Sequence, residues 1–219
     1  ISNYAGGRGV DIQNSVYGVV PTGLALAGKS MDPDILVVQE MTSESAALQI
    51  RGFLNSAPGS PGDWEMETYT ISPDTSSAFF YRTSKVNNLG SFVAVFGGNI
   101  SGAPRHVMRY DWQPVGYTTN ASRVSSFSVH MKAGDTATDQ NRRQVEATQI
   151  VQYINNNLLP FNPGINFMVL GDFNIRSVGE QAYQTMTAVG AGAARVFDPI
   201  NTAGQWGDVG IFRFVHTQD

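Results

Sequence analysis

The apolar positions of the chain include two short runs without any polar residue. Ile35 to Val38 and Phe167 to Leu170 contain only apolar residues, and polar residues follow each run directly. Continuous runs of this length are typical of strands that are covered on both faces. The first run ends in Gln39-Glu40. The second ends in Gly171-Asp172-Phe173-Asn174, where the glycine lets the backbone turn at the carboxyl edge of a sheet.

Other segments show helical spacing or the alternation of a half-buried strand. A third strand is predicted over Val124 to Lys132, where apolar residues alternate with serines before His130-Met131-Lys132. Aromatic or alternating segments separated by turn residues predict an antiparallel meander over 65–71, 78–82, 92–96 and 106–112. Helices are predicted over 16–29, 43–55, 139–159 and 179–189, with a loop over 2–14.

This order of elements predicts an α/β sandwich, with two packed mixed β-sheets flanked by helices in four layers. Ser43 is the expected cap of the second helix, and Thr138 or Asp139 the cap of the third. In the third helix Val145 is expected to face inward, while Arg142 to Gln144 are expected to stay in water.

Composition limits the chain to a small number of domains and leaves several function classes open. The 219 residues are 42% hydrophobic and 15% charged, which is sufficient for one domain with a sizeable core. A net charge of -4 gives no overall electrostatic signature of nucleic-acid binding, although a local basic face stays open. The chain has no cysteine, so thiol catalysis and thiolate metal sites are excluded.

No apolar run approaches the length of a membrane span, and the residues from Ile1 have no signal-peptide pattern. We therefore expect no stable membrane association, and separately we expect a monomer. The compartment stays open, with secretion or export to the periplasm after removal of a leader among the alternatives.

The three predicted strand ends carry a Glu, a His, an Asp and an Asn, namely Glu40, His130, Asp172 and Asn174. Each has an ordinary explanation by itself, as a solvated strand end, a structural histidine or a turn former. Together they suggest a phosphate site. Mg²⁺ prefers carboxylate oxygen and few protein ligands, an aspartate can orient or deprotonate water, and His or Asn can hold phosphate oxygens.

The motifs resemble those of the endonuclease/exonuclease/phosphatase superfamily, which includes pancreatic deoxyribonuclease, apurinic endonucleases and inositol polyphosphate phosphatases. Asp34 to Glu40 resembles its metal-binding strand, Phe127 to Lys132 its catalytic-histidine strand, and Leu170 to Asn174 its Gly-Asp-x-Asn motif. The strand Ala78 to Arg82 and the helix with Asn141 to Gln144 are also similar. The resemblance covers roughly residues 14 to 176.

The resemblance implies a role for each matching residue. Glu40 would be the ligand of Mg²⁺, with Mn²⁺ or Ca²⁺ as alternatives, and His130 would be a catalytic histidine that contacts phosphate. Asp172 and Asn174 would orient water and bind phosphate, and Arg105 would be a basic residue near the substrate. A magnesium-dependent phosphoester hydrolase is implied, with a nuclease or phosphodiesterase preferred and nucleic acid as a candidate partner.

Several positions depart from the family pattern. Asn3 is a poor substitute for the family's first-strand Asn, the residues around His216 are not its Ser-Asp-His element, and no Glu precedes Ala78. We therefore expect a domain truncated at both ends, with full activity in a longer parent chain. Two alternatives stay open, a non-catalytic phosphate-binding module of the same fold and a lipid phosphodiesterase of the sphingomyelinase type. The second would use exposed aromatic residues such as Phe92 to Phe96, which core packing also explains.

Overall fold

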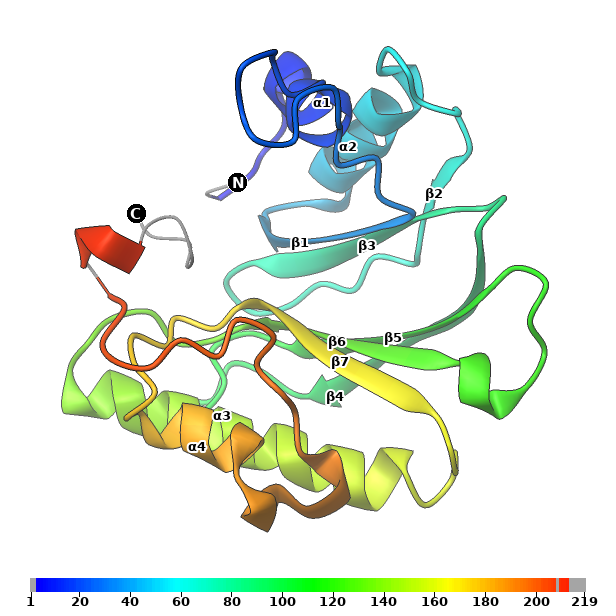
Figure 1. Cartoon of the computed structure of the whole chain (residues 1–219). Coiled ribbons are helices and arrows are strands. Elements are labelled where there is room, and N and C mark those ends of the chain that lie inside the picture. The colour runs from blue at the N-terminus through cyan, green and yellow to red at the C-terminus, as the bar shows by residue number, and fades with distance from the viewer. Residues whose placement is uncertain (1–2, 208, 213–219) are drawn as a thin grey trace.

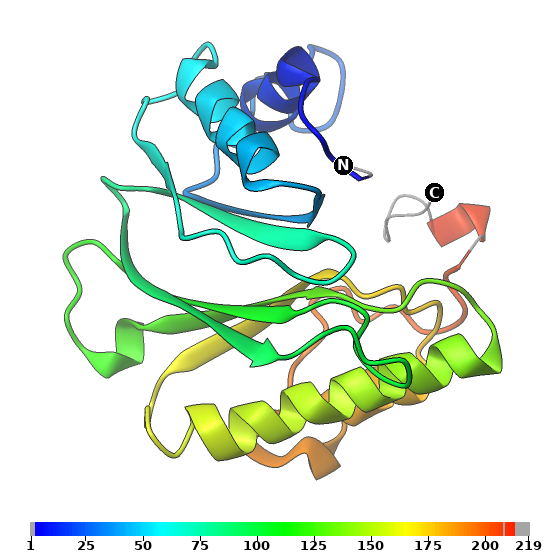
Figure 2. The same cartoon turned by 180° about the vertical axis from the view of Figure 1, so that it is seen from behind.

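The computed structural model describes residues 3–207 and 209–212, and these form two β-sheets packed face to face with helices outside (Figure 1). Within the described residues the strand orders are β1-β3-β2 and β4-β5-β6-β7. Helices α1 and α2 lie beyond the first sheet and α3 and α4 beyond the second, as the reverse view also shows (Figure 2). The predicted four-layer sandwich is confirmed.

The strands are β1 Ile35–Met41, β2 Trp64–Met66, β3 Ser76–Arg82, β4 Val86–Val95, β5 Val107–Pro114, β6 Val124–His130 and β7 Asn166–Asp172. The α-helices are α1 Gly9–Tyr17, α2 Glu44–Ser56, α3 Ala137–Tyr153 and α4 Gln181–Thr187. A π-helical turn, Ile154–Leu158, continues α3, and short 3-10 helices occupy Asn120–Ser122, Val189–Ala194 and Gly210–Phe212.

The first sheet is held to its helices by an apolar layer. The Ser43 side chain accepts the N–H of Ala46 at 3.1 Å, so α2 begins where its predicted cap lies. Ile50 and Leu54 are fully buried on α2 and pack in one cluster with Phe80 of β3. This layer fixes the position of β1, which pairs antiparallel with β3.

The second sheet carries the parallel connection of the fold. Strand β6 leads into α3, and α3 returns the chain to β7, which pairs with β6 in parallel. Phe127 and Val129 of β6 and Ile150 of α3 are fully buried in the layer between them. Because parallel strands end at the same sheet edge, the last residues of β6 and β7 lie side by side.

The two sheets meet across an aromatic layer. Phe79 of β3 stacks on Tyr110 of β5 with ring centroids 4.8 Å apart, and both residues are buried with Met108. A polar chain crosses the same layer, since Gln39 Nε2 donates to Ser128 Oγ at 3.1 Å and Ser128 Oγ donates to Ser77 Oγ at 2.9 Å. These contacts tie the end of β1 to the middle of β6.

Two predictions for the N-terminal region are wrong. Residues 9–17 form α1, although a loop was expected over 2–14, and the helix expected over 16–29 is absent from the described residues. Ile12 and Val16 make α1 stable by packing against the α2 layer. Leu24 and Leu26 are 61% and 75% exposed, so the apolar spacing beyond Tyr17 has no surface to pack against.

Two predictions for α3 are also wrong. Thr136, rather than Thr138 or Asp139, is the N-cap, and it shares a capping box with Asp139. Arg143 was expected in water but is completely buried, whereas Val145 is 38% exposed. The side chain of Arg143 is drawn inward by Glu180, a partner that helical spacing does not reveal.

The middle strands divide between the sheets instead of forming one meander. Strands β2 and β3 join β1, and β4 and β5 join β6. Residues 87–90, among the turn residues expected between the meander strands, lie inside β4, where the register shifts between Asn88 and Gly90. This irregularity lets a polar, glycine-containing segment stay in the ladder. Strand β7 was expected to be covered on both faces, but Met168 is 41% exposed.

Across the described part of the chain, no helix combines the length and the apolar character that crossing a membrane requires.

Candidate functional site

Glu40 lies near the end of β1, where the strand departs from regular pairing. The register with β3 shifts between Val38 and Met41, and Glu40 has a left-handed φ of 64°. The Glu40 Oε2 atom accepts the backbone N–H of Asn3 at 2.5 Å. Asn3 thus reaches the site through its backbone. The carboxylate stays 24% exposed, so it is open to a ligand.

His130 is the last residue of β6 and pairs directly with Asp172 of β7. Its Nε2 atom lies 3.7 Å from Glu40 Oε1 and 3.6 Å from Asp172 Oδ2. Burial lowers the pKa of His130, and the charge of Arg105 lowers this pKa further, while Asp172 and Glu40 oppose the shift. Burial therefore favours the neutral form of this imidazole, which lies between two carboxylates.

The Gly171-Asp172-Phe173-Asn174 segment contains the last two residues of β7 and the two that follow it. A side chain at Gly171 would place its Cβ 2.2 Å from the carbonyl oxygen of Val129, and its φ is 127°, so the position requires glycine. Asn174 donates its backbone N–H to Asp172 Oδ1 at 3.0 Å and its side-chain N–H to the Met131 carbonyl at 3.0 Å. These bonds fix both side chains at the end of the two parallel strands.

Glu40, His130 and Asp172 form a group that could hold a metal ion. Each offers one ligand atom, and these atoms lie within 4.8 Å of one another. Glu40 and Asp172 supply carboxylate oxygens, which are the donors that hard divalent cations prefer. The residues present therefore fit such a cation, and three strands from two different sheets contribute them.

Arg105 also lies at this end of the sheets. Its Nη1 donates to the carbonyl oxygen of His130 at 3.4 Å, and its Nη2 lies 2.6 Å from Asp74 Oδ2. The structure thus places all five residues predicted for the site around the ends of β1, β6 and β7, with Arg105 joining from the loop before β5.

Sequence reasoning missed several polar residues that support this group. Asp74 and Thr75 hold Arg105. Arg143 donates to the carbonyl oxygens of Lys132 and Gly134, both at 2.7 Å, and so fixes the loop after His130. The resemblance of the helix segment 141–144 to the family was a signal for Arg143, whereas Asp74 and Thr75 had none, because their partner Arg105 is distant in sequence.

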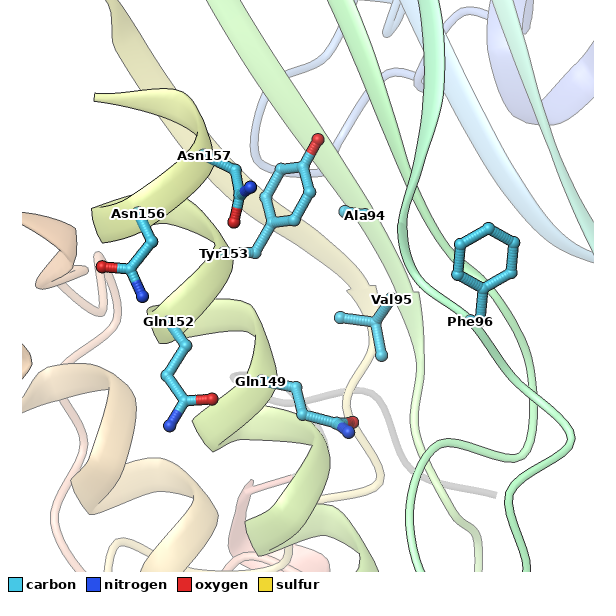
Figure 3. Close-up of a pocket in the computed structure, with 8 residues that line it drawn as sticks. All are labelled: Ala94, Val95, Phe96, Gln149, Gln152, Tyr153, Asn156 and Asn157. Carbon is cyan, nitrogen blue, oxygen red and sulfur yellow. The ribbon is translucent and has the colours of Figure 1, made fainter. Parts of the chain in front are cut away.

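Two concavities of the described chain lie away from Glu40, His130 and Asp172. A cavity of about 440 Å³ lies between β4 and α3, with Phe96, Gln149, Tyr153 and Asn156 among its lining residues (Figure 3). A second, of about 470 Å³, is lined by Asp135, Arg176 and Glu180 beyond the ends of β6 and β7. Neither lining includes a predicted site residue. Glu40, His130 and Asp172 are the candidate site because of their chemistry, since metal and phosphate groups can bind on an open edge.

Comparisons with known proteins give similarity in structure. Neither a protein-family model nor a curated protein sequence matches the chain. Beta toxin from Staphylococcus aureus, as a β-hairpin deletion mutant, has a TM-score of 0.53 at 13% identity, over 84% of this chain and 64% of the toxin.

Two further structures are similar. An endonuclease/exonuclease/phosphatase family protein from Bacteroides thetaiotaomicron has a TM-score of 0.50 at 20% identity, over 73% of this chain and 54% of that one. A conserved protein of unknown function from Enterococcus faecalis has a TM-score of 0.51 at 15% identity, over 70% of this chain and 57% of that one. The chain therefore spans little more than half the length of these two proteins. It has the fold of the endonuclease/exonuclease/phosphatase superfamily.

Proposed function

We propose that this chain is a phosphoester hydrolase that depends on a divalent cation, with Mg²⁺ as the expected ion and nuclease or phosphodiesterase activity. The observation that carries the proposal is the convergence of Glu40, His130 and Asp172 within 4.8 Å. A carboxylate pair around a neutral imidazole suits phosphoryl chemistry, because it can hold a cation and move a proton at the same place.

Glu40 would be the main ligand of the ion, which when bound would offset phosphate charge and make a water molecule more acidic. Asp172 is the group that would orient the attacking water, because its Oδ1 is fixed by the Asn174 N–H and its Oδ2 faces His130. As the water oxygen forms its bond to phosphorus, the water proton would pass to the Asp172 carboxylate. The phosphorus–oxygen bond to the leaving group then breaks, and the leaving oxygen takes a proton from solvent.

His130 and Asn174 would hold the phosphate oxygens. His130 Nε2 lies 3.7 Å from Glu40 Oε1 and 3.6 Å from Asp172 Oδ2, too far for a hydrogen bond to either, so an N–H there could be directed to a phosphate oxygen that gains charge. Asn174 uses one side-chain N–H on the Met131 carbonyl, and an amide has a second N–H to offer. Arg105 would add a positive charge beside them.

The test is hydrolysis of a substrate panel with and without Mg²⁺. The panel contains DNA, RNA, a phosphoinositide and phospholipid vesicles, and EDTA serves as the metal-free control. We expect Mg²⁺-dependent hydrolysis of at least one class, and a loss of about 100-fold to 10,000-fold in rate for Asp172→Asn. An Asp172→Asn variant with full activity, or no hydrolysis by either the wild-type chain or a longer parent chain, would contradict the proposal.

A lipid phosphodiesterase is the second candidate, and exposed aromatic side chains favour it. Phe92 and Phe96 are 49% and 73% exposed on and just after β4, although core packing was an alternative explanation for them. Ile71 and Ile100, in neighbouring loops, are 81% and 89% exposed. Hydrolysis of vesicles but not of nucleic acid would support this candidate, and substrate binding without turnover would support the non-catalytic alternative.

A further inference from the structure

Arg105 is held by contacts on all three of its guanidinium nitrogens. Nη2 lies 2.6 Å from Asp74 Oδ2, Nε donates to Thr75 Oγ1 at 3.1 Å, and Nη1 donates to the His130 carbonyl at 3.4 Å. A guanidinium has five N–H groups, so one N–H on each Nη stays without a partner among the described residues. Two donors on one rigid fork match two oxygens of a phosphate.

The loop that carries Asp74 and the loop that carries Arg105 are joined independently of this ion pair. The backbone N–H of His106 donates to Ser72 Oγ at 2.7 Å, and the Ser72 N–H donates to Ser76 Oγ at 3.0 Å. Gly98 also approaches Pro73, since a Cβ there would lie 3.2 Å from Pro73 Cγ. The loops therefore do not need the Asp74–Arg105 contact to stay together.

The ion pair is also a poor source of stability. The Asp74 side chain is 55% exposed, and its backbone has a left-handed φ of 66°. Exposed ion pairs contribute little to folding, because water screens both charges. Arg105, by contrast, is only 15% exposed and lies against the His130 end of β6. What the pair does provide is a fixed orientation of the guanidinium.

We propose that Asp74, supported by Thr75, is a positioning residue that orients Arg105 for the phosphate of the substrate. An arginine that is already ordered loses less conformational freedom when it binds a ligand. This assignment rests on the proposed function for the nature of the substrate, but not for the binding of phosphate itself. Asp74 acts through Arg105 and does not touch the reacting atoms.

The experiment is a double-mutant cycle read by the binding of inorganic phosphate in the presence of Mg²⁺, followed by ³¹P NMR. Because one long side chain would have to be ordered again, we expect Asp74→Ala to raise the Kd by about 3-fold to 10-fold. Arg105→Ala should raise it at least as much. In the Arg105→Ala background the change at Asp74 should have no further effect.

Two further variants separate orientation from a general structural effect. Asp74→Glu keeps the carboxylate and should recover part of the affinity, whereas Asp74→Asn loses the charge with little change in shape. Glu65→Gln, at the exposed Arg51–Glu65 ion pair, is the matched control and should leave phosphate binding unchanged. Thermal unfolding of each variant checks that the fold is kept.

Three outcomes would overturn the assignment: absence of phosphate binding to the wild-type chain, unchanged binding by Arg105→Ala, or the same loss on Asp74→Ala with and without Arg105. Tighter phosphate binding by Asp74→Asn would show that the Asp74 carboxylate only offsets the positive charge of Arg105. This outcome would also overturn the assignment. If phosphate binds with the expected coupling but no phosphoester is hydrolysed, the proposed function fails and the positioning role stands.

Discussion

Glu40 has a backbone conformation that few residues of its type adopt. Its φ of 64° lies in the left-handed region, where asparagine is tolerated but a longer side chain is strained. The structure holds this conformation with two bonds, since the Tyr4 N–H donates to the Glu40 carbonyl at 2.7 Å and the Asn3 N–H to the carboxylate at 2.5 Å. Such strain at a residue that we propose to bind a metal ion agrees with a functional role.

For this residue we predict that Glu40→Gln sharply raises the Mg²⁺ concentration needed for half-maximal activity. The amide keeps the shape but loses the charge that attracts a divalent cation. Because the side chain is partly exposed, the free energy of unfolding should change by only about 0.5 kcal/mol. A Mg²⁺ titration of activity and a urea titration measure the two quantities, with Glu65→Gln as the control. An unchanged Mg²⁺ dependence would remove Glu40 from the metal site.

Among the elements, α3 connects the core to the loop that follows His130. Arg143 of α3 is fully buried, pairs with Glu180 at 2.8 Å and donates to the Lys132 and Gly134 carbonyls. A buried charge is stable only with its partners, so the helix, the residue before α4 and the loop after β6 depend on one another. The site thus relies on a contact on the far side of the sheet.

We therefore predict that Arg143→Ala destabilises the protein by about 3 to 5 kcal/mol, because the Glu180 charge is left buried without its partner. Arg142→Ala is the matched control. Among the residues that the structure describes, its guanidinium donates to the carbonyls of Asn99 and Gly102 alone, so its loss should cost about 1 kcal/mol. Urea unfolding compares the two variants, and equal costs would contradict the special role of Arg143.

In the molecule as a whole, one buried acid makes stability depend on pH. Glu146 is completely buried, and neither carboxylate oxygen has a hydrogen-bond partner among the described residues. Burial raises the pKa of Glu146 to about 8, although the charges of Arg105 and Arg142 oppose this shift. The folded protein therefore keeps a proton that the unfolded chain releases at about pH 4.3.

The direction of this pH dependence follows from the number of protons that each state binds. Between about pH 4.3 and pH 8 the folded state binds more protons at Glu146 than the unfolded state does. The stability that protonated Glu146 contributes is therefore fully present below about pH 4.3 and is lost as the pH rises to about 8. Glu146→Gln should flatten this decline and gain at least ~1 kcal/mol relative to the wild type between pH 5 and pH 8. Urea titrations across this range test it, with the exposed Glu44→Gln as control. Parallel curves for wild type and variant would contradict it.

The sequence by itself determined the sandwich, the strand ends and the order of the site residues. These are local properties: an apolar run that ends in Gln39-Glu40 or Gly171-Asp172 contains the information that a buried strand stops there. The four residues predicted at three strand ends lie together because sheets align the ends of their strands. The glycine requirement at Gly171 belongs to the same pattern.

Only the tertiary structure decided the contacts between residues that are distant in sequence. It buried Arg143 against Glu180, joined Asp74 to Arg105, and made residues 9–17 a helix by giving Ile12 and Val16 a surface on α2. It also left Phe96 in solvent, where its aromatic character had allowed core packing. The physical reason is that burial and charge pairing depend on the neighbours that folding supplies, whereas strand ends and turns depend on the adjacent residues of the chain.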